Sequence, residues 1–90
     1  MRICQSIKAI TGSEIQFEIT IYLEEDQNFS VEMNVTAFPA GTLFKCAEDA
    51  LIASVKALNG FHPDDRIKRL YSSPVEQFIT NEQMATLLPE

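Results

Sequence analysis

A chain of 90 residues with 46% hydrophobic and 22% charged side chains has the composition of one soluble globular domain, and we expect residues 1–90 to form it. No apolar run approaches the ~20 residues of a membrane span, and the N-terminus lacks the apolar stretch of a signal peptide. We therefore expect a cytoplasmic protein with no membrane partner. The net charge of −6 argues against direct binding to nucleic-acid phosphates, which depends on Lys and Arg.

The first predicted element is a strand at residues 2–10, with the sequence RICQSIKAI. Its apolar face is formed by Ile3, Ile7 and Ala9, and Gln5 interrupts that face. Because this alternation is weaker than that of the strands that follow, we expect an edge strand or the start of a meander.

The stretch from Glu14 to Phe38 shows the clearest pattern in the sequence. Two arms alternate apolar and polar residues around a turn-forming run at residues 25–28. A period of two is typical of strands with one buried and one solvated face, so we expect an antiparallel hairpin. Its buried face would consist of Ile15, Phe17, Ile19, Ile21, Leu23, Phe29, Val31, Met33, Val35 and Ala37.

The solvated face of this hairpin is expected to be negative and free of bases. Between Lys8 and Lys45 the chain has no basic residue but six acidic ones. Most of these acids fall on the polar face or at its rim, where they suit either a solubilising surface or one that binds a partner. The candidate partner-binding residues are Glu14, Glu18, Tyr22, Glu24, Glu25, Asp26 and Glu32.

A helix is predicted from about Leu43 to Leu58, with apolar residues at steps of three and four. Thr42 is its expected N-cap, because a hydroxyl there accepts from an otherwise unpaired backbone N–H. Asn59 and Gly60 are its expected stop, because Gly fits the left-handed position beyond a helix end. The stripe that would cover the hairpin contains Phe44, Ala47, Leu51, Val55 and Leu58.

The region after Gly60 allows two interpretations. Residues 62–65 resemble a helix start, with Pro early and acids near the positive end of the dipole, and a fourth strand at Ile67–Ser72 is the alternative. The tail predicts two short helices at about 74–79 and 81–88, or one bent helix, each preceded by a capping-box pattern.

The predicted fold class is therefore α+β. A three-stranded antiparallel meander would pack on one long helix, and a short helical C-terminal segment would complete the core or cover an edge. Three strands are about the minimum for a sheet that packs stably on a helix.

The sequence lacks the patterns that catalysis, metals and cofactors require. His62 is the sole histidine and is expected in an exposed loop. Cys4 and Cys46 lack zinc-site spacing, and we expect reduced, largely buried thiols; a disulfide between them would need an oxidising compartment. The acidic turn lacks the internal Gly of a calcium loop. We expect no catalytic residues, no metal site and no cofactor.

Two resemblances follow from the order strand, strand, strand, helix. With its helix AEDALIASVKAL, the chain is similar to the second half of double-stranded-RNA-binding domains, which implies basic residues at the helix start. This chain instead has Glu48 and Asp49 there, with only Lys45 nearby. The stretch from Phe17 to Leu58 resembles HicB-type antitoxin domains, but lacks their Gly-Asp-Thr lead into the helix. Both likenesses are topological and assign no family.

The leading functional hypothesis is a small acidic, non-enzymatic module that binds another protein. A nucleic-acid-binding protein is one such partner, which the chain would inhibit by occupying a basic groove, as phage-type inhibitors such as anti-CRISPR proteins do, or in an antitoxin-like way. The alternative is a subunit of a homo-oligomeric structural or regulatory assembly, for example a homodimer through a sheet edge or face. An enzyme of unknown type is the third hypothesis.

Overall fold

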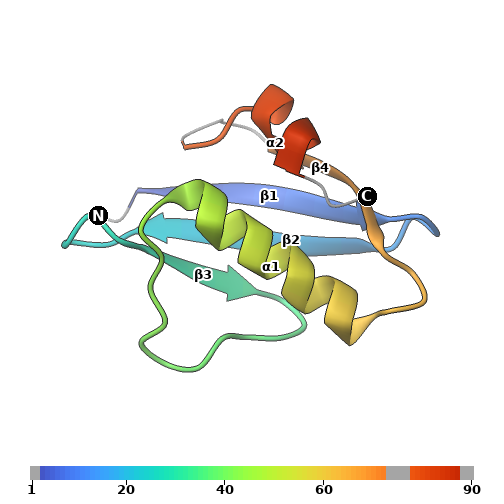
Figure 1. Cartoon of the computed structure of the whole chain (residues 1–90), viewed down its shortest axis with the longest axis horizontal. Helices are drawn as coiled ribbons and strands as arrows, with labels where there is room; N and C mark the ends of the chain where they lie inside the picture. The colour runs from blue at the N-terminus through green and yellow to red at the C-terminus, as the bar shows by residue number, and fades with distance from the viewer. Residues whose placement is uncertain (1–2, 73–77, 88–90) are drawn as a thin grey trace.

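The computed structural model describes residues 3–72 and 78–87. They form a four-stranded antiparallel sheet, in the order β3-β2-β1-β4, and two helices, so the predicted α+β class is confirmed (Figure 1). The predicted count of three strands is one too few. The strands are β1 (Cys4–Thr11), β2 (Gln16–Leu23), β3 (Phe29–Met33) and β4 (Ile67–Ser72), and the helices are α1 (Ala47–Phe61) and α2 (Asn81–Leu87).

The strand β1 lies between β2 and β4, so it is not an edge strand but begins the meander β1-β2-β3, the second of the two predicted possibilities. Its inward face alternates as a central strand requires, with Gln5, Ile7, Ala9 and Thr11 all at most 2% exposed. The two polar residues at its ends weaken the pattern in the sequence. Each of them has a hydrogen-bond partner far along the chain, which offsets the free-energy cost of burying its polar group.

The helix α1 crosses one face of the sheet and forms the core with it (Figure 1). Leu51, Val55 and Leu58 are at most 1% exposed, as their helical spacing predicts. Small side chains allow close approach to the strands: Ala50 is fully buried, and Ser54 satisfies its hydroxyl by donating to the Ala50 carbonyl at 2.7 Å.

The bounds of α1 differ from the prediction at both ends. The helix begins at Ala47, and Thr42 donates its hydroxyl to the Pro39 carbonyl at 2.6 Å within a turn, so Thr42 is not the N-cap. Before the helix, Phe44 instead forms an isolated antiparallel bridge with Phe29. Gly60 lies inside the last turn of α1 and does not end it.

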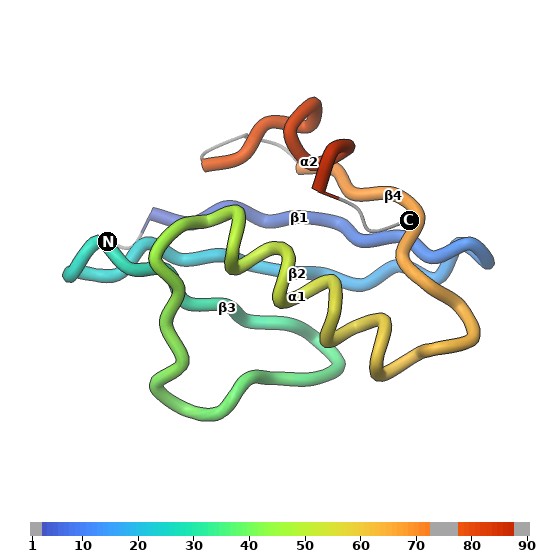
Figure 2. Tube along the Cα trace, viewed as in Figure 1, coloured from blue at the N-terminus to red at the C-terminus, as the bar shows by residue number. Residues whose placement is uncertain are grey.

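The strand β3 ends at Met33, before the predicted limit at Ala37. The 34–46 loop then leaves the sheet and returns to α1, as the tube in Figure 2 shows. Because the pairing with β2 stops at Met33, Val35 lies outside the sheet and is 37% exposed. Ile15 similarly precedes β2 and is 41% exposed, so both ends of the predicted apolar face are wrong.

Residues 67–72 form β4, so the alternative of a fourth strand is confirmed and the helix start at 62–65 is wrong. Residues 62–65 form a turn in which the Asp65 N–H donates to the His62 carbonyl at 3.1 Å. Asn59 links the end of α1 to the new strand, since its Oδ1 accepts from the Ile67 N–H at 2.8 Å.

The Asp65 side chain joins this turn to the β1–β2 turn. It accepts from the Thr11 hydroxyl at 2.8 Å and from the Ser13 N–H at 3.0 Å. Burial alone would raise the pKa of Asp65, but these two hydrogen bonds, with help from nearby His62, hold the pKa below its ordinary value of 3.8.

The side-chain amide of Gln5 joins the C-terminal segment to the sheet. Its Oε1 accepts from the N–H groups of Phe78 and Ile79 at 2.7 and 3.0 Å, and its Nε2 donates to the Ile79 carbonyl at 2.8 Å. Ile79 and Met84 are thereby placed in the core, fully buried. Of the predicted helix at 74–79, residues 74–77 lie outside the described residues, and Phe78 and Ile79 are not helical.

The capping box predicted at Thr80 is confirmed. The Thr80 hydroxyl accepts from the Gln83 N–H at 3.1 Å, and Gln83 Oε1 accepts from the Thr80 N–H at 2.9 Å. These reciprocal bonds begin α2 within the predicted range 81–88.

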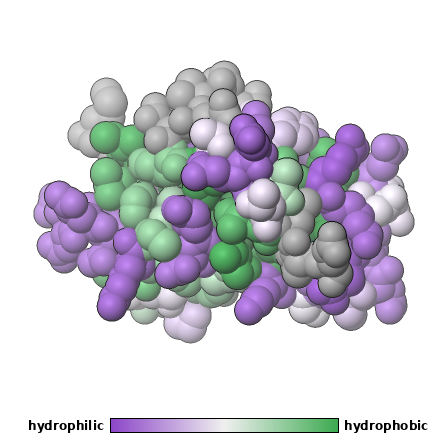
Figure 3. Space-filling model, turned by 45° about the horizontal axis from the view of Figure 1, so that its top comes forward, coloured by the Kyte–Doolittle hydropathy of each residue, from purple (hydrophilic) through white to green (hydrophobic). Residues whose placement is uncertain are grey.

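On the helix-bearing side, apolar surface gathers between two hydrophilic ends (Figure 3).

The two cysteines are free thiols, and Cys4 is exposed whereas Cys46 is half-buried, so the predicted burial of Cys4 is wrong. Neither helix formed by the described residues is long and apolar enough to cross a membrane.

Replacing Gln5 by Leu should lower the free energy of unfolding by about 2–4 kcal/mol, because it leaves buried backbone groups of Phe78 and Ile79 unpaired. Gln16→Leu, an exposed position on β2, is the matched control and should change it by less than ~0.5 kcal/mol. Urea unfolding monitored by circular dichroism measures both, and equal effects of the two variants would contradict the role given to Gln5.

Replacing Asp65 by Asn should destabilise the protein at neutral pH, with a difference from the wild type that shrinks as the pH falls below 3.8. A carboxyl whose pKa is lowered on folding stabilises the native state above its unfolded pKa, and this stabilisation is lost as the pH falls through the folded pKa. Unfolding curves at several pH values test this. The exposed neighbour Asp64→Asn is the control, and a pH-independent deficit for Asp65→Asn would refute the account.

Candidate functional site

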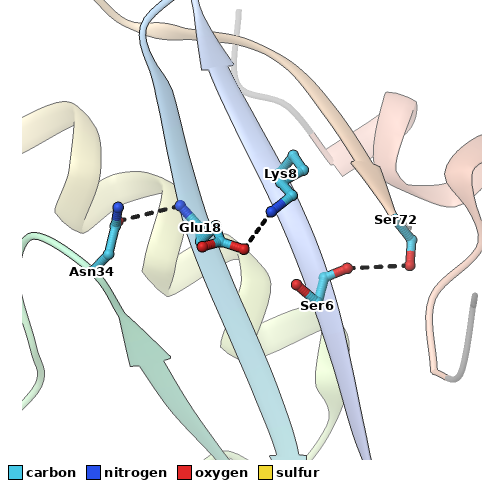
Figure 4. Close-up of polar contacts among 5 residues, drawn as sticks. All are labelled: Ser6, Lys8, Glu18, Asn34 and Ser72. Atoms are coloured by element: carbon cyan, nitrogen blue, oxygen red, sulfur yellow. Dashed lines mark hydrogen bonds and ion pairs between the residues drawn. The ribbon is translucent and has the colours of Figure 1, made fainter. Parts of the chain in front are cut away.

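One face of the sheet carries both helices, and the opposite face carries neither. Figure 4 views the sheet from that opposite side, with α1 behind the strands. The pairing registers place residues from all four strands on it, since Lys8 lies opposite both Glu18 and Tyr71, and Thr20 lies opposite Glu32. We call this surface the open face; it is formed by Ser6, Lys8, Ile10, Gln16, Glu18, Thr20, Tyr22, Ser30, Glu32, Arg69 and Tyr71.

The centre of the open face is an ion pair between Lys8 and Glu18 (Figure 4). The Lys8 side chain is only 24% exposed, whereas that of Glu18 is 50% exposed. The Glu18 N–H donates to Asn34 Oδ1 at 3.2 Å, which fixes the strand beside the pair. Lys8 therefore neutralises a predicted acidic site residue, and the expectation of a face free of bases is wrong.

Glu14 does not lie with the other predicted site residues. It occupies the β1–β2 turn with a φ of 68° and approaches Arg69 at 3.8 Å, both side chains being mostly exposed. The whole of β2 separates it from Glu24, a span of roughly 25 Å at the usual rise of a strand.

The acidic turn between β2 and β3 forms a second charged region, at one end of the molecule (Figure 1). Glu25 and Asp26 are exposed there, and Glu24 accepts a hydrogen bond from the Ser30 hydroxyl. We call this region the acidic end; it comprises Glu24, Glu25 and Asp26.

The structure thus brings three of the predicted residues onto the open face, namely Glu18, Tyr22 and Glu32. Sequence reasoning missed Lys8 and Tyr71, of which Tyr71 is 39% exposed. Lys8 sits on the polar face of the strand predicted at 2–10, so its alternation could have indicated it. Tyr71 belongs to the strand that was only the alternative interpretation of its region.

The described residues offer no group of three or more His, Cys, Asp or Glu side chains placed to hold a metal ion. The imidazole of His62 packs among aromatic rings, with centroids 6.1 Å from Phe17 and 6.0 Å from Phe61. No protein-family model, curated protein or solved structure matches the chain.

The coupling between Lys8 and Glu18 should be worth less than ~1 kcal/mol, because both side chains keep contact with water. A double-mutant cycle with Lys8→Met and Glu18→Gln, read by urea unfolding, measures it, and the coupling should decline further in about 1 M salt. A coupling above about 2 kcal/mol would contradict this, because it would indicate a desolvated ion pair that a partner could break only at a large cost in free energy.

Proposed function

We propose that this chain is a small acidic, non-enzymatic module that binds another protein through the open face of its sheet. The observation that carries the proposal is the placement of α1 and α2 on one side only, so that within residues 3–72 and 78–87 no helix lies over the other side of the four-stranded sheet. Such a surface is broad and rigid, because its backbone is fixed by three strand pairings.

The chemistry of the open face suits a protein partner. Tyr22 and Tyr71 supply the amphipathic aromatic groups that are enriched in protein interfaces and at their energetic centres. Lys8, Glu18 and Glu32 add charges of both signs, which favour orientation and specificity over raw affinity. Nucleic acid is a poorer partner, because the net charge of the chain is −6.

An acidic variant of this proposal assigns the partner a basic surface, such as the nucleic-acid-binding groove that an inhibitor or an antitoxin-like regulator would occupy. Because Lys8 and Arg69 neutralise the centre and one edge of the open face, this variant rests on Glu32 and on the acidic end. We place the module in the cytoplasm as part of the same proposal, since both cysteines are free thiols, the form that a reducing compartment maintains.

The second candidate is a subunit of a homo-oligomeric assembly. Exposed apolar side chains favour it, notably Ile3 and Leu43 at 49% and Phe61 at 54%. Sedimentation at micromolar concentration separates the two candidates, because a strict monomer removes the second.

Affinity capture with the immobilised protein, from its native cell or the host of that cell, should yield a partner that Tyr71→Ala and Glu32→Lys release. Phe61→Ala, an exposed aromatic on the helix-bearing side, and Asp64→Lys, with the same change of charge in the turn between α1 and β4, are the matched controls and should retain it. For the acidic variant, the dissociation constant should rise roughly tenfold or more between low and high salt.

Two outcomes would contradict these statements separately. Loss of the partner with Phe61→Ala but not with Tyr71→Ala would move the site to the helix-bearing side. An affinity independent of salt would remove the acidic variant while leaving the open face as the binding surface.

A further inference from the structure

The outer edge of β3 has a defined pattern of main-chain groups. The N–H of Phe29 donates to the Phe44 carbonyl, and the N–H of Phe44 donates to the Phe29 carbonyl, both at 2.8 Å. Phe29 therefore directs its main chain away from β2. Successive residues of an antiparallel strand direct these groups to opposite sides, so Val31 and Met33 also direct theirs outward.

Two further contacts support this alternation. The Glu18 N–H reaches Asn34 on the β3 side, whereas the Leu23 N–H donates to Ile3 on the β1 side. Even-numbered residues of β2 thus bond towards β3, and odd-numbered ones towards β1. In the described part of the chain, the outward N–H and C=O groups of Val31 and Met33 have no main-chain partner.

The surroundings of this edge differ on its two sides. On the helix side, Val31 and Met33 pack with the core, and the 34–46 loop adds apolar groups. No charged residue occurs between Val35 and Phe44. On the open-face side, Glu32 is exposed and has no ion-pair partner among the residues described. The acidic end continues the negative charge, and Lys45 is the one base beside Phe44.

We propose that β3 binds an extended segment of a partner protein as an added strand, with an apolar–basic–apolar sequence opposite Val31, Glu32 and Met33. Backbone groups on such an edge supply affinity, and alternate side chains supply specificity. The Lys or Arg of the segment would face Glu32, and its apolar neighbours would face the helix side. This inference rests on the proposed function and deepens it by naming the chemistry of the partner segment.

A second copy of the chain fits this edge poorly. A two-fold antiparallel pairing that uses both Val31 and Met33 is centred on Glu32, which then lies directly opposite Glu32 of the second copy. Like charges in that position destabilise a pair of strands. Charged residues on edge strands prevent self-association in this way, so charge complementarity selects a basic segment.

Titration of the isotope-labelled protein with two synthetic peptides tests the proposal by NMR. Both peptides have blocked ends and the five-residue sequence Thr-Val-Xaa-Val-Thr, with Lys or Glu at the centre, so that they end before Phe29, whose outer edge Phe44 occupies. The Lys peptide should shift the amide signals of Val31 and Met33 and bind roughly three- to tenfold more tightly than the Glu peptide. Glu32→Lys should reverse this order, and Asp64→Lys should leave it unchanged.

A third peptide carries Lys at its centre and N-methyl groups on the two residues beside it, which removes the donors facing β3. It should not bind. Equal binding of the Lys and Glu peptides, or signal shifts away from β3, would overturn the proposal. The proposal would also be overturned if the amide signals of Val31 and Met33 shifted with protein concentration in the absence of peptide, because a second copy would then occupy the edge. None of these results would affect the capture experiment, in which Tyr71→Ala releases the partner from the open face. Failure of the strand-addition proposal can therefore be distinguished from failure of the proposed function.

Discussion

The side-chain amide of Gln5 holds the C-terminal segment against the middle of the sheet. It lies on the covered face of a central strand, 1% exposed, and makes hydrogen bonds to both N–H groups and one carbonyl of Phe78 and Ile79. An unpaired polar group there would cost about 1–3 kcal/mol, so the arrangement that satisfies the amide is strongly preferred. Because Ile79 and Met84 enter the core from this segment, the placement of α2 depends on the same side chain.

The local part of this fold could be predicted from the sequence, and the part set by distant partners could not. Alternation predicts the buried face of β2, where Phe17, Ile19 and Ile21 are at most 4% exposed. The weak alternation of residues 2–10 predicts an edge strand or the start of a meander, and the edge position is wrong because Gln5 and Thr11 are buried against groups 74 and 54 positions away. No local pattern in the sequence indicates these distant hydrogen-bond partners.

The candidate site shows the same division. Alternation places Glu18, Tyr22 and Glu32 on one face without knowledge of the fold. Lys8 lies beside Glu18, and Tyr71 of β4 lies beside Lys8, because of strand pairings that no local pattern in the sequence indicates. The mixed charge of the open face is therefore seen only in the structure. It restricts the proposed acidic variant to Glu32 and the acidic end.

The two faces of the sheet thus have different roles. The covered face provides the core, whereas the open face and the outer edge of β3 are the surfaces through which we propose that a partner binds. Residue-resolved hydrogen exchange of the free protein tests this division most directly. We expect the amides of Val31 and Met33 to exchange quickly. The amides of Ser30 and Glu32 should be protected, because they are hydrogen-bonded to β2. Equal protection of all four amides would contradict it, because another segment or a second copy would then already occupy the edge.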